Sequence, residues 1–187
     1  MPYRDSNFLF RLLIAATILF GMSTELRASD FPECAIKAYA RDVEGKRVWQ
    51  NGLHNFIVRL RPDLESVANA GRDLQIAYAE LGFVRLKYLA IADPSRIVTD
   101  TSLSVFRNFE WSDTDEAAIL AADASYERLV GALAGLRSHN DSQSGWQALR
   151  TFIRVEVSRS PEFVALLTGL QHAEKAVKDA LKGCRKN

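Results

Sequence analysis

The chain has 187 residues, of which 48% are hydrophobic and 25% are charged, and its formal net charge is +1 at pH 7. This composition excludes intrinsic disorder, which needs low hydrophobicity and high net charge, and the length predicts one domain with a hydrophobic core. The near-neutral charge also argues against nucleic acid as a partner, because that binding needs a clustered positive surface.

The N-terminal segment has the pattern of a secretory signal peptide. Arg4 and Arg11 precede an apolar run at residues 12–22, LLIAATILFGM. A charged start followed by roughly 7–15 apolar residues is typical of a signal peptide, whereas a membrane-spanning helix needs about 20. Because Arg11 interrupts any longer run, the pattern favours a cleaved signal over a membrane anchor.

Two small-residue cleavage sites follow this run, one ending at Ser23 and one ending at Ala28. We favour the cut after Ala28, which gives a signal peptide at 1–28 and a single helical domain at 29–187. The mature part then carries equal numbers of acidic and basic side chains. No second apolar stretch approaches spanning length, so we expect a periplasmic or secreted protein with no membrane span after signal cleavage.

The two cysteines, Cys34 and Cys184, lie at opposite ends of the predicted mature chain. An even number of cysteines behind a signal peptide predicts a disulfide bond, and no C-x-x-C motif suggests a catalytic dithiol. Closing a loop of this size contributes about 5 kcal/mol in the chain-entropy description. The bond would join the first helix to the end of the last one.

Apolar residues at helical spacing predict three helices in the first half of the chain, at 32–42, 48–61 and 63–92. Glu44-Gly45-Lys46 is expected to separate the first helix from the second. Pro62 separates the second from the third, and Asp93-Pro94 ends the third, because a residue before proline disfavours the helical conformation.

The second half begins with residues 99–109, which are rich in Val, Thr and Phe and fit either a short helix or an extended strand; we expect the helix. An acidic start at 112–116 predicts a helix that runs to residue 138, and a polar loop follows at 139–145. Two more helices are expected at 146–158 and 161–183, the last with Ser160 as its cap and Pro161 in its first turn.

These elements predict an all-α fold. We expect an antiparallel bundle of three to four main helices plus shorter helices, with its termini tied by the Cys34–Cys184 disulfide. The sequence has no strict heptad repeat, which favours a globular bundle over an extended coiled coil.

The sequence lacks the common motifs for catalysis and metal binding. The Glu-x-x-His pair of di-metal bundles does not occur, and neither does G-x-S-x-G, a Walker-type loop or G-x-G-x-x-G. A calcium loop starting at Asn140 would need carboxylates that are missing, including the bidentate Glu, whose place Thr151 takes. We therefore assign no catalytic and no metal-binding residues and predict no cofactor.

The main alternative to a protein without a cofactor is a bundle that binds haem. His54 and His172 both fall on predicted helices and could ligate a haem from two sides. The C-x-x-C-H motif of c-type cytochromes is absent around Cys184, and both methionines, Met1 and Met22, lie in the signal peptide. A Met/His pair is therefore excluded, and a pair of histidines is the remaining option.

Aromatic side chains gather in the segment before the acidic helix start. Phe106, Phe109 and Trp111 lie close together with Arg107 between them, and Trp146 opens a later helix. Aromatic residues with an arginine are enriched in the energetically dominant parts of interfaces, so we take these five as candidate binding residues. The alternative interpretation, which we favour, is that the rings cap one end of the bundle core.

The sequence favours a secreted or periplasmic, non-catalytic helical bundle that binds a protein partner or acts as an accessory module. The alternative is a sensor bundle that binds a small molecule or haem. A hydrolase of unknown substrate is the third possibility, since a catalytic triad is recognised by geometry and not by sequence order. The partner is thus expected to be a protein or a small ligand, and not nucleic acid.

Overall fold

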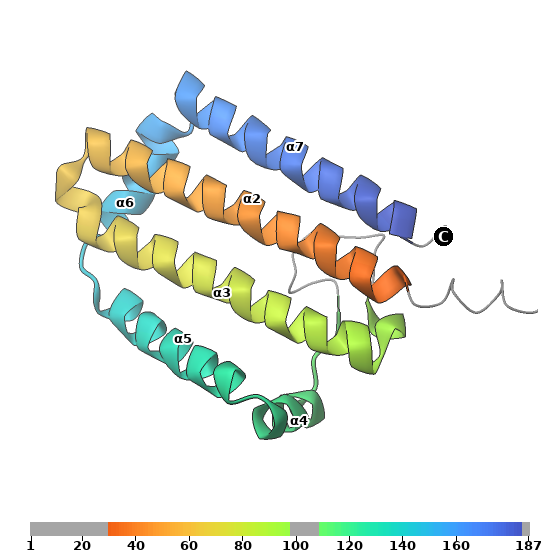
Figure 1. Ribbon diagram of the computed structural model, residues 1–187. Helices are drawn as coiled ribbons and strands as arrows, with labels where there is room; N and C mark the ends of the chain where they lie inside the picture. The colour runs from red at the N-terminus through yellow and green to blue at the C-terminus, as the bar shows by residue number, and fades with distance from the viewer. Residues whose placement is uncertain (1–29, 98–108, 185–187) are drawn as a thin grey trace, which may run out of the picture.

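The fold is that of a computed structural model, which describes residues 30–97 and 109–184 (Figure 1). The α-helices of this part are α2 (Asp30–Leu60), α3 (Glu65–Ala92), α4 (Asp113–Ala122), α5 (Ala124–Ser142), α6 (Trp146–Phe152) and α7 (Pro161–Cys184). Short 3₁₀ turns lie at Pro62–Leu64 and Pro94–Arg96, and a π-helical turn, Ile153–Val157, follows α6. The described residues 30–97 and 109–184 contain no strand, which confirms the predicted all-α class.

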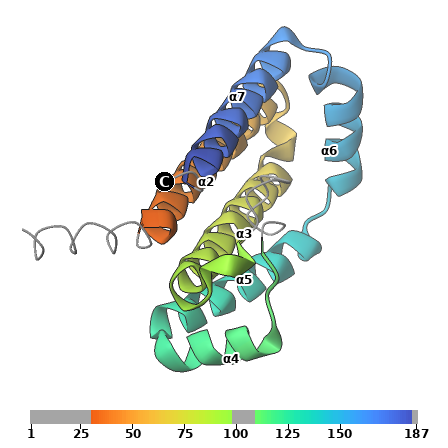
Figure 2. The same ribbon diagram turned by 90° about the vertical axis from the view of Figure 1, so that its right-hand side faces the viewer.

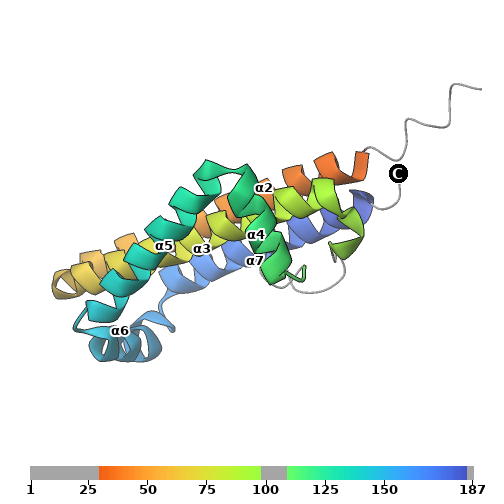
Figure 3. The same ribbon diagram turned by 90° about the horizontal axis from the view of Figure 1, so that it is seen from below.

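The four long helices lie side by side in the order α7, α2, α3, α5, and neighbours run antiparallel (Figure 1). α2 packs against both α3 and α7, while α3 packs against α5. The short α6 lies across one end of this row, and α4 lies at the other end of α5 (Figures 2 and 3). The predicted bundle of three to four main helices is therefore confirmed.

The first helix is longer than expected, because α2 continues through Glu44-Gly45-Lys46 without a break. The predicted separation into 32–42 and 48–61 is wrong. The glycine is used for packing: a Cβ atom at Gly45 would lie 3.3 Å from Cβ of Ala173 on α7. Burial against a neighbouring helix outweighs the weak helix propensity of one glycine, which is about 1 kcal/mol.

The helix expected from 113 to 138 is instead two helices, α4 and α5, separated at Asp123. The backbone of Asp123 is extended, and its carboxylate accepts a hydrogen bond of 2.7 Å from the backbone N–H of Ser125, which caps α5. α5 then continues to Ser142, so the polar loop expected at 139–145 is only three residues long. Gly145 ends it with a φ of 98°, a conformation that favours glycine.

Several predicted boundaries are confirmed. The chain leaves the helical conformation before Pro62 and at Asp93, and α7 starts at Pro161, where Oγ of Ser160 accepts from the backbone N–H of Phe163 at 3.1 Å. Apart from Phe109, the helix expected at 99–109 lies outside the described residues, as does the predicted signal peptide.

The core consists of three groups of buried side chains. The first lies between α2, α3 and α7 near the chain ends and includes Ala35, Tyr39, Leu86, Leu89, Val177 and Leu181. The second lies at the opposite end, where α6 covers α2 and α3, and includes Phe56, Ile57, Val67, Leu149, Phe152 and Val157. The third joins α3 to α4 and α5 through Leu74, Ala77, Leu81, Ile119, Tyr126 and Leu133.

The predicted disulfide between Cys34 and Cys184 is present, with a Cα–Cα distance of 5.7 Å. It joins the first turns of α2 to the last turn of α7 and closes a loop of 150 residues. No helix of the described ranges is both long and apolar enough to cross a bilayer.

Candidate functional site

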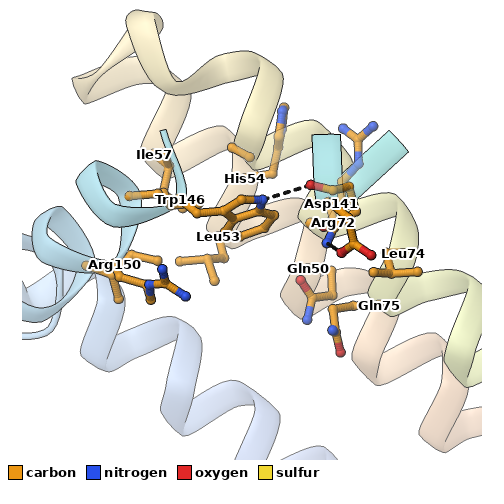
Figure 4. A pocket seen from close by; sticks show the side chains of 15 residues that line it. Gln50, Leu53, His54, Ile57, Arg72, Leu74, Gln75, Asp141, Trp146 and Arg150 are labelled. Carbon is orange, nitrogen blue, oxygen red and sulfur yellow. Dashed lines mark hydrogen bonds between the residues drawn. The ribbon is translucent and has the colours of Figure 1, made fainter. Parts of the chain in front are cut away.

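A pocket of about 550 Å³ opens at the end of the bundle that lies away from the disulfide. Figure 4 shows the side chains that line it. It lies between the C-terminal half of α2, the N-terminal half of α3, the end of α5 and α6. Its volume falls within the range of about 300–1,000 Å³ that small-molecule sites occupy.

One wall of the pocket is apolar. Leu53 and Ile57, four residues apart on α2, face Leu149 and Ile153, four residues apart on α6 and the turn after it. Residues at this spacing share one face of a helix, so the two helices contribute matching apolar stripes. Leu74 of α3 also lines the pocket.

Trp146 forms a second wall, and its ring is fixed at both edges. A Cβ atom at Gly71 would lie 2.9 Å from Cη2 of the ring, so the indole occupies the space that a side chain on α3 would need. At the other edge, Nε1 donates a hydrogen bond of 2.9 Å to the backbone carbonyl of Asn140. The ring is therefore held in place where it lines the pocket.

His54 contributes a polar atom that lacks a partner. Its Nδ1 lies 3.1 Å from Oδ1 of Asn55, to which it can donate. Its Nε2 is buried and makes no hydrogen bond. Within the described ranges, no other buried side-chain nitrogen or oxygen lacks a hydrogen-bond partner. Leaving such an atom unsatisfied costs about 1–3 kcal/mol, so a ligand atom that pairs with it is favoured.

Three other polar side chains at the pocket also lack hydrogen-bond partners among the described residues. Within the described part of the chain, the side chains of Gln50, Gln75 and Arg150 make no hydrogen bond or ion pair. Arg72 differs, because its guanidinium pairs with Asp73 at 2.7 Å. Together with Asp141, the pocket has two arginines and one carboxylate among its lining residues, and neither Arg150 nor Asp141 takes part in an ion pair within the described ranges.

Of the predicted binding residues that the structure describes, Phe109 and Trp111 lie away from Trp146. Phe109 is buried in the core near the chain ends, and Trp111 packs against it edge-on with ring centroids 6.2 Å apart. Trp146 lies elsewhere, in the wall of the pocket. Phe106 and Arg107 lie outside the described residues, so their part in a binding surface stays a prediction.

Trp111 belongs to a polar network between α3, α4 and α5. Its Nε1 donates to Glu116 at 2.6 Å, and the same carboxylate accepts from the Tyr126 hydroxyl at 2.6 Å and from Arg85 at 2.8 Å. Burial, with the hydrogen bond to Glu116, raises the pKa of Tyr126 to about 12. Because each of these groups already has a partner, the network serves to join the three helices.

Several residues of the pocket could not be identified from the sequence. Arg150, Gln50 and Gln75 come from three different helices, and no spacing along the chain marks them as neighbours. Trp146 was predicted as a binding residue and does line the pocket, while His54 was considered only as a haem ligand. The one sequence signal for this site is glycine at position 71 on a long helix, where a large ring can approach.

No protein-family model, curated protein or solved structure shows significant similarity to this chain. The pocket must therefore be interpreted from its own chemistry. Within the described ranges, no group of three or more His, Cys, Asp or Glu side chains is placed to hold a metal ion.

Proposed function

We propose that this protein binds a small amphipathic carboxylate in the pocket between α2, α3 and α6. The observation that carries the proposal is the buried, unpaired Nε2 of His54 beside an apolar wall. Small-molecule sites combine such a wall with a few polar groups that orient the ligand.

The charge of the polar groups favours an acidic ligand. The lining residues include two arginines and one carboxylate, and Arg150 is the arginine without an ion-pair partner in the described ranges; its planar guanidinium matches a carboxylate through two parallel hydrogen bonds. The apolar body of the ligand would lie against Leu53 and Trp146. Nε2 of His54 would accept a hydrogen bond from a ligand hydroxyl when the ring is neutral, or donate one to the ligand carboxylate when both ring nitrogens carry protons, since Nδ1 donates to Oδ1 of Asn55 in both states.

The pocket favours binding over catalysis. Its lining residues include no Ser, Thr, Cys, Tyr or Lys, so His54 has no nucleophile beside it to activate. A haem held by two histidines is disfavoured on geometric grounds, because His172 is exposed on α7 and does not line the pocket.

We further propose that binding takes place outside the cytoplasm, in the periplasm or the medium. The predicted signal peptide supports this location. The Cys34–Cys184 disulfide is compatible with it, since disulfides persist in oxidising compartments.

The test is a calorimetric titration with octanoate, octan-1-ol and octylamine, which share one alkyl chain and differ in charge. We expect octanoate to bind at least tenfold more tightly than octylamine and to change the fluorescence of Trp146. The Trp146→Phe variant should lack this change in fluorescence. Binding of none of the three compounds would contradict the proposal.

A matched pair of variants tests the head group. Arg150→Gln should weaken octanoate binding about tenfold, because hydrogen bonds to charged groups contribute about 1.5–3 kcal/mol. Arg154→Gln is the control, since Arg154 is also exposed and lies one turn further along but does not line the pocket. Equal losses in both variants would show that Arg150 is not the carboxylate ligand.

A further inference from the structure

A second hollow of about 520 Å³ lies next to the pocket, between α3 and α5. Gln75 lines both spaces, so they meet at this residue. The α3 residues of the two spaces, from Ala68 and Gly71 through Gln75 to Tyr78 and Arg85, follow one another at helical spacing. At a rise of 1.5 Å per residue, Ala68 and Arg85 are about 25 Å apart along the helix axis.

The second hollow is apolar where a ligand would lie and offers few free polar groups. Leu81, Val130 and Leu133 line it. Tyr78 and Arg137 bind each other, and Arg85 is engaged by Glu116. An extended peptide would bring backbone N–H and C=O groups that need partners, and these engaged side chains do not supply them. An alkyl chain has no such requirement.

From this arrangement we infer that the ligand is a long-chain fatty acid, with its carboxylate at His54 and Arg150 and its alkyl chain running past Gln75 into the space between α3 and α5. The inference rests on the proposed function, whose pocket supplies the head-group site. The direction of the chain follows from the free hydrogen-bonding groups, because Nε2 of His54 and the Arg150 guanidinium lack partners and lie at the pocket end, whereas Arg85 and Arg137 at the second hollow already donate to Glu116 and Tyr78. A short acid would fill the pocket alone.

The first measurement compares octanoate with dodecanoate on the oxidised protein. Each additional buried methylene raises affinity by up to about fourfold. We therefore expect dodecanoate to bind at least 30-fold more tightly than octanoate. Equal affinities would overturn the inference and leave the proposed function intact, whereas binding of neither acid would remove both.

The second measurement blocks the hollow from α5. Ala134 is exposed and lines the second hollow but not the pocket, so Ala134→Phe should fill the path of the chain. Dodecanoate affinity should fall to the octanoate level, while octanoate affinity stays within twofold. Ala132→Phe is the control, because Ala132 is exposed on the same helix and lines neither space. Equal loss for both acids, or the same loss in both variants, would contradict the path.

Discussion

The indole of Trp146 lies so close to Gly71 that a methyl group on α3 would meet its outer edge at 2.9 Å. This contact joins α6 to α3 and sets one wall of the pocket. The ring has little freedom to retreat without affecting its hydrogen bond to the carbonyl of Asn140, which lies 2.9 Å from Nε1.

Gly71→Ala should therefore be destabilising although alanine is the better helix former. We expect its free energy of unfolding to fall about 1–3 kcal/mol below that of Gly131→Ala, because overpacking costs that much. A Cβ atom at Gly131, on α5, meets nothing within 4 Å, so this control should gain about 0.5–1 kcal/mol. Urea unfolding of both variants checks the prediction, which fails if they are equally stable.

Removing the disulfide should lower stability without changing the helical content. Serine in place of both Cys34 and Cys184 should reduce the free energy of unfolding by about 2–5 kcal/mol, since the open chain gains entropy when unfolded. Urea unfolding with and without a reducing agent measures the effect. The reductant should shift the native protein and leave the double variant unchanged; a shift in both would point to another cause.

Phe109 should act as a core residue. It is 8% exposed among side chains of α2, α3 and α7, so Phe109→Ala should cost about 3–5 kcal/mol. Ile91→Ala is the comparison, because Ile91 is 80% exposed and its truncation should change stability by no more than about 0.5 kcal/mol. Thermal unfolding distinguishes the two. A stable Phe109→Ala protein would reopen the case for a surface role of this ring.

Asp115 should make the protein less stable in acid. The hydrogen bonds from Arg96, at 3.0 and 2.8 Å, and then those from Ser112 hold the pKa of Asp115 well below its usual 3.8. A carboxyl with a lowered pKa in the folded state contributes stability that is present above the unfolded pKa and lost as the pH falls below it.

The free energy of unfolding of Asp115→Asn should thus lie below that of the native protein at pH 7, and the gap should narrow between about pH 5 and pH 2. Asp113→Asn removes a carboxylate from the same helical turn and keeps the pair with Arg96, so it serves as the control. A gap that stays constant down to pH 2 would rule out the contribution of this pair.

Most of the helices and the disulfide could be predicted from the sequence, because each rests on local or countable signals. Pro62, Pro161 and Ser160 act through their own backbone or side chain, so their effect does not depend on distant residues. The two cysteines are the only ones in the chain, which left a single possible pairing.

Two helix boundaries were predicted wrongly, one because a distant contact decides it and the other because a local cap lies inside a run with helical spacing. Gly45 looked like a break, but Ala173 on α7 makes a small residue useful there. Asp123 sits in a run that reads as continuous helix, and only the capping of Ser125 by its carboxylate reveals the turn. The pocket could not be predicted from the sequence, since its polar residues come together only after three helices have packed.

The Cys34–Cys184 bond also makes the domain a covalent ring. Every residue of the pocket and of the second hollow lies between the two cysteines, as do the connections at Asp123 and Gly145. A single proteolytic cut in any of these connections would leave the two pieces attached to each other. Such nicked molecules would keep the mass of the intact protein, apart from one added water, until the disulfide is reduced.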